Sequence, residues 1–302
     1  MYEVKRAAVI GAGVMGAAIA AHLANVGVPS LLLDVPAEGE GRAARDRLAR
    51  QGLERALNAS PALFYDKADA RLIETGNVED DLERLRACDL VVEAIVERLE
   101  AKRALFARVA EVRAPHAIVS SNTSGISVNA MAAGLPGDFQ RHFLVTHFFN
   151  PVRYMKLLEI VPGRATDPDV VKAAQRFGTE RLGKGVVLCK DTPNFIANRL
   201  GVYGFMIALR RALDEGYRFD EVDTIMGEPM GRPRSAIFRT CDIAGLDVLL
   251  HVAQNVYDNA PDDECRDVFA PPPLLQEMVA RGWLGEKSGQ GFYKRIKGAE
   301  GS

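Results

Sequence analysis

A histidine and a glutamate twelve positions apart lie in one apolar stretch and could together perform proton transfer. His147 ends the first of two β-rich apolar runs between residues 145 and 161, and Glu159 lies inside the second. A carboxylate in such surroundings is costly to keep ionised unless it is paired, because burial penalises an isolated charge. If the strands bring the two together, Glu159 would hold the imidazole in one tautomer and support it as a general base. These residues alone leave an equal alternative: a core histidine bonded to backbone and a glutamate at a strand edge.

A glycine-rich turn near the N-terminus could bind the phosphates of a dinucleotide. Gly11, Gly13 and Gly16 follow a short apolar run and precede a segment with apolar residues at helical spacing. The first glycine permits the tight turn, the second lets the backbone approach a pyrophosphate, and the third lets the helix pack closely on the strand. The helix N-terminus would then offer N–H groups and a positive dipole end to the phosphates.

An aspartate at the end of the next apolar run indicates which dinucleotide is bound. Asp34 follows Gly16 by eighteen residues, where a Rossmann unit places the acid that binds the adenosine ribose hydroxyls. No arginine follows it in Asp34-Val35-Pro36, and its carboxylate would repel a 2′-phosphate. The pattern therefore predicts NAD rather than NADP, with a βαβ unit that binds no dinucleotide as the alternative.

Two further groups of polar residues follow predicted strands. Residues 89–96 form a buried strand that leads into Glu97 and then into a helix containing Lys102. Residues 117–119 form another strand, which runs into the small polar segment 120–125, with Ser124 in it. Ligands bind at the carboxyl edge of doubly wound sheets, so we expect these side chains to face a ligand. The segment 120–125 could also cap a helix, and both roles can hold at once.

The order of these elements predicts the fold class. Strands and helices alternate up to about residue 190, with a basic helix at 42–58 and an irregular segment at 59–86 that has a turn signal at Gly76-Asn77. Residues 193–216 then indicate one long helix, and helical segments near 220–226, 245–257 and 273–281 follow. We therefore predict an α/β Rossmann-type doubly wound sheet in residues 1–190, followed by a smaller all-α domain in residues 191–302.

Composition and charge exclude several function classes. The 302 residues carry a net charge of −2, which implies no overall attraction to nucleic acid or to a membrane. The four cysteines are far apart and the five histidines form no metal-binding pattern, so neither a metal site nor a disulfide framework is predicted. No apolar run approaches the roughly 18 residues of a membrane span, and the N-terminus has no signal-peptide pattern. We expect a cytoplasmic protein.

Seven motifs, taken together, carry a resemblance to a known family. In chain order they are VIGAGVMG, VVEAIVE, SSNTS, THFFNPVRYMKLLEI, KDTPNFIANR, IAGLD and GEKSGQGFY, and they extend from residue 6 to residue 295. The chain resembles the 3-hydroxyacyl-CoA dehydrogenase family of fatty-acid β-oxidation, and especially the dehydrogenase portion of larger proteins that also carry an enoyl-CoA hydratase domain.

The resemblance implies an activity and a role for four residues. The expected reaction is the NAD-dependent oxidation of L-3-hydroxyacyl-CoA to 3-ketoacyl-CoA. His147 matches the base that takes the proton from the 3-hydroxyl, and Glu159 matches the carboxylate that pairs with it. Ser124 and Asn198 match the residues that hydrogen-bond the substrate near the reacting carbon. An NAD-dependent dehydrogenase of a free hydroxy or sugar acid and a non-catalytic NAD-binding protein are the alternatives.

The resemblance also implies cofactor contacts and partners. The matching cofactor positions are Gly11, Gly13, Val14, Met15, Gly16, Asp34, Glu97, Lys102, Ser124, Asn150 and Lys287. Relatives pair through the helical second domain, so a homodimer is expected. The chain could also be part of a longer β-oxidation polypeptide or complex.

Departures from the family pattern concern the coenzyme A end of the substrate. Ala56 falls near the position of the usual serine, and residues 61–63 disrupt the rest of that pattern. Lys67 and the basic helix 42–55 are the alternative contacts for coenzyme A, although a solvated helix face is the favoured interpretation of that helix. Three arginines of the second domain could bind a phosphate or lie at the surface, and the surface is favoured: Arg232, Arg234 and Arg239.

Overall fold

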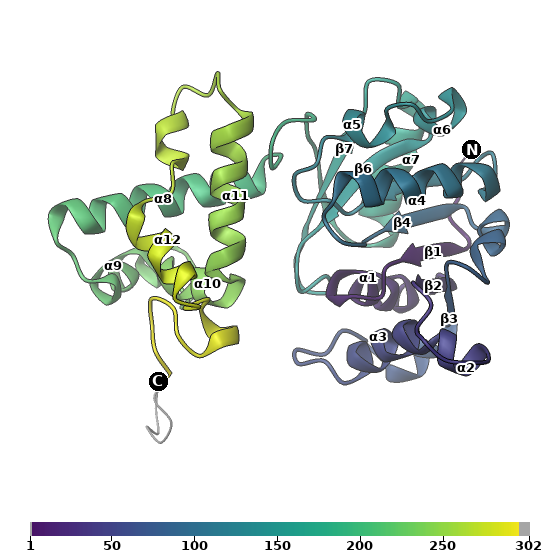
Figure 1. Cartoon of the computed structure of the whole chain (residues 1–302), viewed down its shortest axis with the longest axis horizontal. Helices are drawn as coiled ribbons and strands as arrows, with labels where there is room; N and C mark the ends of the chain where they lie inside the picture. Colours follow the sequence, from purple (N-terminus) through teal and green to yellow (C-terminus); the bar gives the residue numbers. More distant parts are fainter. Residues whose placement is uncertain (1, 296–302) are drawn as a thin grey trace. The chain divides into compact units, whose positions relative to one another are not determined.

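The computed structural model describes residues 2–295 and divides into two compact units, Met1–Asp191 and Thr192–Ser302 (Figure 1). The first unit is an eight-stranded sheet with helices packed on it, and the described part of the second unit is helical apart from two isolated bridges. The predicted fold class, a Rossmann-type α/β sheet followed by an all-α part, is confirmed.

The sheet of the first unit has the strand order β3-β2-β1-β4-β5-β6-β7-β8. Its strands are β1 (Ala7–Ile10), β2 (Ser30–Asp34), β3 (Ile73–Asn77), β4 (Leu90–Glu93), β5 (Ile118–Ser121), β6 (Phe143–Phe148), β7 (Leu157–Pro162) and β8 (Gly185–Leu188). All neighbouring strands pair in parallel except β6 and β7, which are antiparallel. The strand order reverses beside β1, because β2 lies on one side of it and β4 on the other. Doubly wound sheets bind ligands at such a reversal, outside the carboxyl ends of the strands.

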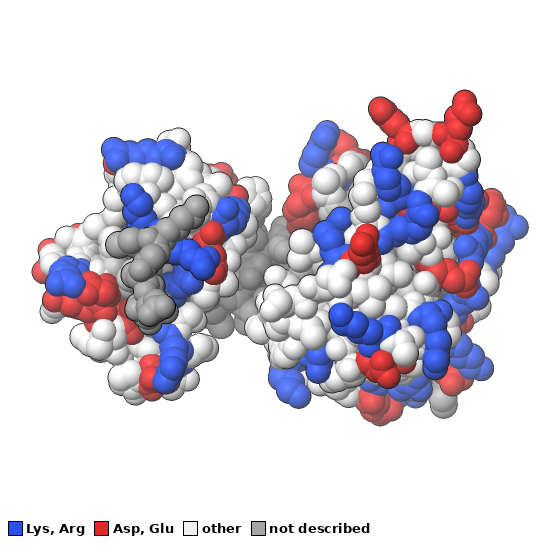
Figure 2. All heavy atoms as spheres, turned by 90° about the horizontal axis from the view of Figure 1, so that it is seen from below, with Lys and Arg blue, Asp and Glu red and all other residues white. Residues whose placement is uncertain are grey.

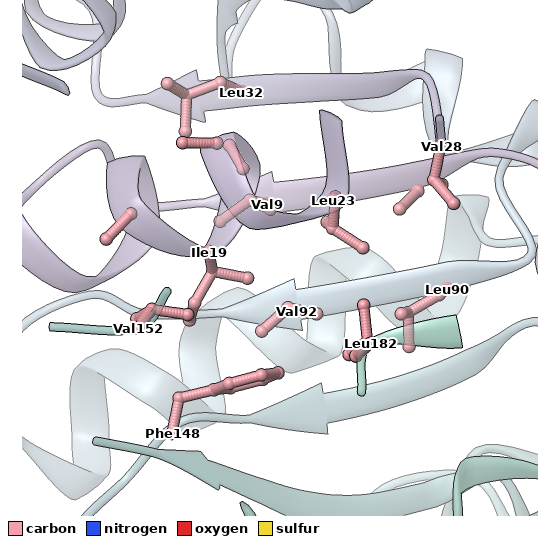
Figure 3. Packing of buried hydrophobic residues seen from close by; sticks show 14 of the residues in the cluster. Val9, Ile19, Leu23, Val28, Leu32, Leu90, Val92, Phe148, Val152 and Leu182 are labelled. Carbon is pink, nitrogen blue, oxygen red and sulfur yellow. The ribbon is translucent and has the colours of Figure 1, made fainter. Parts of the chain in front are cut away.

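Helices cover the sheet and complete its core. They are α1 (Val14–Asn25), α2 (Arg42–Arg45), α3 (Arg47–Leu57), α4 (Leu99–Val112), α5 (Val128–Ala132), α6 (Gly137–Arg141) and α7 (Pro168–Arg176), with the 3₁₀ helices η1 (Lys67–Leu72) and η2 (Leu82–Ala87) and the π-helix η3 (Phe177–Arg181). Figure 3 shows Ile19 and Leu23 of α1 lying over Val9 and Val92 of the central strands. This apolar layer stabilises the sheet and leaves its carboxyl edge for polar residues.

The second unit packs five helices around its own core. They are α8 (Ala197–Glu215), α9 (Phe219–Met226), α10 (Phe238–Ala244), α11 (Leu246–Asn259) and α12 (Pro273–Ala280), with turns at η4 (Glu228–Met230), η5 (Arg266–Phe269) and η6 (Glu286–Ser288). Phe219, Phe238 and Phe292 pack with ring centroids 4.8–4.9 Å apart. The buried Asp242 accepts the backbone N–H groups of Phe292 and Tyr293, each at 2.9 Å, and so holds the last described segment against this core.

Three local expectations were wrong. The segment 59–86, expected to be irregular, contains the edge strand β3, and its Gly76 has a structural reason: a Cβ there would lie 2.3 Å from Asp81 Oδ2. The basic helix is interrupted at Asp46 into α2 and α3. The long helix begins at Ala197 rather than at residue 193, because Asn194 and Phe195 have φ values of 57° and 53°, outside the right-handed helical region.

Two surface properties bear on partners. Among residues 2–295, no helix is both long enough and apolar enough to cross a lipid bilayer. On the face seen in Figure 2, basic and acidic side chains are interspersed over the first unit. This mixture is consistent with the small net charge of −2.

A buried histidine in α1 predicts how stability depends on pH. His22 is 4% exposed, its Nε2 lies 3.1 Å from Leu182 O, and its Nδ1 has no hydrogen-bond partner among the described residues. Burial, with a smaller contribution from the Lys184 charge, lowers the pKa of His22 from 6.5 to about 4. Between these two values the unfolded chain binds more protons than the folded chain, so stability is full above pH 6.5 and falls as the pH drops toward 4.

We expect this histidine to remove up to roughly 3 kcal/mol of stability between pH 6.5 and pH 4. Denaturant unfolding at several pH values, compared between the wild type and His22→Gln, measures its share. The variant should lose less stability over this window than the wild type. Equal slopes for the two proteins would contradict the assignment.

Candidate active site at the carboxyl edge of the sheet

A cavity of about 520 Å³ lies beside the point where the strand order reverses. Its lining includes Gly11, Gly13, Asp34, Val35, Ala94, Ile95, Val96 and Arg108. These residues follow or end β1, β2 and β4, or belong to α4. The cavity therefore occupies the place where this fold class binds a dinucleotide.

The glycine loop has the geometry that a pyrophosphate requires. Gly11 has φ +103°, and a Cβ there would lie 2.5 Å from Ala94 O. A Cβ on Gly16 would lie 1.7 Å from Gly11 O, so only glycine allows the helix to approach the turn this closely. A Cβ on Gly13 would meet nothing within 4 Å, so its backbone faces open space. The helix that follows begins at Val14, which is 70% exposed, with the half-buried Met15 next to it.

Asp34 ends β2 at the same edge and is fixed by backbone donors. Its Oδ2 accepts the N–H of Ala12 at 2.6 Å and its Oδ1 accepts the N–H of Val35 at 2.7 Å. The carboxylate is thus tied to the glycine loop and lines the cavity. A ribose diol is a suitable ligand for a carboxylate held in this position.

Three of the residues predicted from separate motifs are brought together after β4 and β5. Glu97 Oε1 accepts the backbone N–H of Ser124 at 2.9 Å and also the hydroxyl of Thr123. Lys102, which is 1% exposed, places its ammonium 3.2 Å from Glu97 Oε2. The same ammonium lies 2.6 Å from Glu93, a buried carboxylate that our sequence interpretation missed. The available signal was a glutamate at the end of an otherwise apolar strand.

His147 and Glu159 form a buried pair. They are opposite each other in the antiparallel register of β6 and β7, so their side chains project from the same face of the sheet. Nδ1 of His147 lies 2.7 Å from Oε2 of Glu159, and the two residues are 3% and 0% exposed. The ring of Phe149 packs against the imidazole with centroids 4.4 Å apart. This arrangement can hold one imidazole tautomer and stabilise the imidazolium that forms when the ring takes a proton.

The loop between β6 and β7 is anchored at two points. It contains the exposed Asn150, which precedes a cis peptide bond to Pro151. The ammonium of Lys184 donates to the carbonyl oxygens of Val152 and Met155. Burial, with a contribution from the Lys156 charge, lowers the pKa of Lys184 to about 8.

The second anchor of this loop is an arginine. Arg153 Nη1 donates to Ala62 O at 2.8 Å and to Phe64 O at 2.9 Å, and its guanidinium lies 4.2 Å from the centre of the Tyr65 ring. Together with Lys184, this contact fixes both sides of the segment that joins the histidine strand to the glutamate strand.

Two predicted residues belong to the second unit. Asn198 lies in the first turn of α8, and Lys287 lies in η6. The Lys287 ammonium is 2.6 Å and 2.7 Å from the two carboxylate oxygens of Asp247. Within its unit, Lys287 is therefore part of an ion pair at the surface.

The basic residues considered as contacts for coenzyme A or for a phosphate lie in ion pairs or at the surface. Arg42 pairs with Asp81, and Arg45 makes two bonds of 2.7 Å and 2.8 Å to Asp80. Lys67 begins η1 and is exposed. In the second unit Arg234 lies 3.2 Å from Glu228, Arg239 lies 3.5 Å from Glu286, and Arg232 is exposed. These positions agree with the favoured surface interpretation.

No group of three or more His, Cys, Asp or Glu side chains within residues 2–295 is arranged to hold a metal ion.

Comparisons with known proteins agree on one family. The model for the 3-hydroxyacyl-CoA dehydrogenase NAD binding domain matches residues 6–192, and the model for the C-terminal domain of the same family matches residues 195–295. A probable 3-hydroxyacyl-CoA dehydrogenase of Bacillus subtilis is 50% identical over 305 residues, covering 97% of this chain and 38% of the relative. One of Deinococcus radiodurans is 50% identical over 295 residues, covering 98% and 84%. The crystal structure of Mycobacterium tuberculosis FadB2 is similar with a TM-score of 0.82 and 33% identity, covering 97% of this chain and 99% of that one.

If Asp34 binds the adenosine ribose, its replacement should weaken NADH binding. We expect Asp34→Ala to raise the NADH dissociation constant about 10- to 100-fold, because hydrogen bonds to a charged acceptor are lost. Binding of NADPH relative to NADH should improve, since the charge that repels a 2′-phosphate is removed. Titration of the nicotinamide fluorescence measures both constants.

The matched control is Glu38→Gln, which removes an exposed carboxylate four residues away. It should leave both dissociation constants unchanged. Equal weakening by the two substitutions would show that Asp34 acts only through overall charge.

Proposed function

Because the chain belongs to the 3-hydroxyacyl-CoA dehydrogenase family, we propose that it oxidises L-3-hydroxyacyl-CoA to 3-ketoacyl-CoA with NAD, as a step of fatty-acid β-oxidation. The observation that carries the proposal is the buried His147–Glu159 pair, with 2.7 Å between Nδ1 and Oε2. It supplies a base near the carboxyl end of β6, in the same sheet whose edge carries the glycine loop and Asp34. The chain spans 38% of the length of the Bacillus relative. A role for the chain as part of a longer β-oxidation polypeptide is therefore also a proposal.

His147 is the proposed general base. Since Nδ1 faces Glu159, Nε2 is the nitrogen that takes the proton of the 3-hydroxyl. Glu159 accepts the Nδ1–H bond and stabilises the positive charge that appears on the ring as the proton arrives. A base positioned in this way contributes about 10²–10⁴-fold to the rate. The proton leaves the oxygen as hydride leaves C3, so the developing alkoxide is neutralised during the transfer.

NAD, when bound, accepts the hydride at its nicotinamide ring. The proposed contacts of the chain with this cofactor are Gly11, Gly13, Val14, Met15, Gly16, Asp34, Glu97, Lys102, Ser124, Asn150 and Lys287. The open backbone at Gly13 and the fixed carboxylate of Asp34 are the observations that fit it. Ser124 and Asn198 are proposed to hydrogen-bond the substrate near C3, which is orientation rather than acid–base work. We assign NAD binding to residues 1–190, and part of the substrate cleft to residues 191–302.

A homodimer formed through the second unit is also proposed. Several large apolar side chains of that unit are more than half exposed: Leu200, Tyr217, Ile225, Met230 and Ile243. We propose that a second copy of the chain covers these side chains. Sedimentation equilibrium should give about twice the 32.9 kDa chain mass. A single chain mass at micromolar concentration would refute the dimer.

The base assignment predicts the effect of replacing the histidine. We expect His147→Gln to lower kcat by about 10²–10⁴-fold, because the amide cannot take the hydroxyl proton, and to leave NADH affinity nearly intact. Glu159→Gln should also lower kcat, since a neutral amide does not stabilise the imidazolium. The measurement is NADH consumption with acetoacetyl-CoA and with longer 3-ketoacyl-CoAs.

His142→Gln provides the matched control, because His142 is a neighbouring histidine bonded to Asp138 O and to Tyr2 instead. It should retain activity. Turnover of free keto acids alone would favour the free-acid dehydrogenase, and tight NADH binding without any turnover would favour a non-catalytic protein.

A further inference from the structure

A buried carboxylate at the end of β4 is connected to Ser124 through two intervening side chains. Glu93 is 0% exposed. Its Oε1 lies 2.6 Å from the ammonium of Lys102 and accepts the N–H of Ile95 at 2.7 Å, while its Oε2 accepts the hydroxyl of Ser121 at 2.5 Å. Each oxygen of this carboxylate is therefore held by at least one donor, and its position in the core is closely fixed.

Lys102 carries the connection outward. Its ammonium lies 3.2 Å from Glu97 Oε2, which is farther than its distance of 2.6 Å from Glu93. The other oxygen of Glu97 accepts the N–H of Ser124 at 2.9 Å and the hydroxyl of Thr123. The Glu97 side chain is 38% exposed and that of Glu93 is 1% exposed, so the network extends from the core to the edge of the sheet.

Two carboxylates therefore share one ammonium, and the buried carboxylate holds it more closely. If Glu93 lost its charge, the ammonium would approach Glu97 and compete with Ser124 and Thr123 for that carboxylate. A buried ion pair contributes little net stability compared with apolar side chains of similar volume. What such an ion pair can do is fix the positions of the side chains at the sheet edge.

The segment that Glu93 controls is also tied to the histidine strand. The N–H of Asn122 donates to the carbonyl of Glu93 at 2.7 Å, and Oδ1 of Asn122 accepts the N–H of Phe148 at 2.9 Å. Phe148 is the neighbour of His147 on β6. A displacement of residues 122–124 would therefore change the position of Ser124 relative to the general base.

We propose that Glu93 is a positioning residue that sets Ser124 at the reacting edge by holding Lys102 and, through it, Glu97. This inference rests on the proposed function, in which Ser124 hydrogen-bonds the substrate. The misplacement of a substrate-holding group by about 1 Å can cost about 10²-fold in rate. Glu93 itself touches neither substrate nor cofactor in this account.

The test begins with Glu93→Gln in the full chain. We expect kcat with acetoacetyl-CoA to fall about 10- to 100-fold, because Ser124 is misplaced. The NADH dissociation constant should rise by a smaller factor, because Glu97, Lys102 and Ser124 are displaced but the glycine loop and Asp34 keep their places. Glu93→Asp keeps the charge on a shorter side chain and should give an intermediate kcat. The control is Glu74→Gln, which removes the charge of a glutamate on β3 that pairs with Arg6 and Arg84. This variant should retain full activity.

A double variant separates positioning from simple support of the fold. Glu93→Gln combined with Lys102→Met removes both buried charges, so its stability should recover relative to Glu93→Gln alone. Under our proposal kcat stays low even at saturating NADH, because Glu97 has lost the ammonium that holds it. The use of saturating NADH separates this effect from any loss of cofactor affinity at Lys102. Recovery of both stability and kcat would overturn the proposal, as would an unchanged kcat in Glu93→Gln. If Glu93→Gln does not fold, Glu93→Asp carries the test, and a wild-type kcat in that variant would then overturn the proposal.

A second readout does not depend on the reaction. Hydrogen exchange of the peptide covering residues 122–126 should be faster in Glu93→Gln than in the wild type, and unchanged in Glu74→Gln. If the wild type fails to turn over acyl-CoA substrates, the proposed function fails, and the exchange rates still decide whether Glu93 orders this segment. Equal exchange in wild type and Glu93→Gln would overturn the positioning role.

Discussion

The pairing of β7 antiparallel to β6 is the constraint on which the site depends. Every strand pair from β3 to β6 is parallel, and a parallel neighbour needs a long crossover before the chain returns to the same edge. By reversing direction, the chain brings Glu159 opposite His147 after only twelve residues. Both side chains are almost fully buried, so each needs the other. A register shift of one residue would turn Glu159 to the opposite face and break its contact with His147.

Other buried charges near this pair fix the positions of loops and side chains more than they stabilise the fold. Lys184 holds the loop between the two strands through two carbonyl oxygens, and the low pKa that burial gives it reflects the cost of keeping that ammonium in the interior. Glu93 and Lys102 form an ion pair with 1% exposure on each side chain. The stability that offsets these costs comes from the apolar layer of α1 on the central strands (Figure 3). Apolar burial in the interior thus stabilises the sheet. This stability offsets the cost of the buried charges that fix a small number of side chains at the polar edge.

Much of this arrangement could be predicted from sequence, because the signals are local. The glycine loop, the aspartate after the second strand and the alternation of strands and helices each depend on residues close together in the chain. The His147–Glu159 contact could be anticipated only as one of two alternatives, since spacing does not reveal strand direction. The role of Glu93 was missed because its partners, Lys102 and Ser121, come from other elements. Gly76 reads in the sequence as a turn signal, but it lies in β3, where its lack of a side chain makes room for the carboxylate of Asp81. The start of α8 depends on two left-handed residues, Asn194 and Phe195. Asparagine is enriched in this conformation but phenylalanine is not, so the sequence does not indicate the pair.

We propose that Glu159 holds the His147 imidazole in the tautomer with the proton on Nδ1, so that Nε2 accepts the substrate proton. Nitrogen-15 NMR of the imidazole, in the wild type and in Glu159→Gln, measures this directly. We expect the wild type at neutral pH to show a protonated Nδ1 and an unprotonated Nε2, and we expect the variant to lose this preference. A wild-type imidazole with its proton on Nε2, or a tautomer ratio that the Glu159 substitution does not change, would contradict the account.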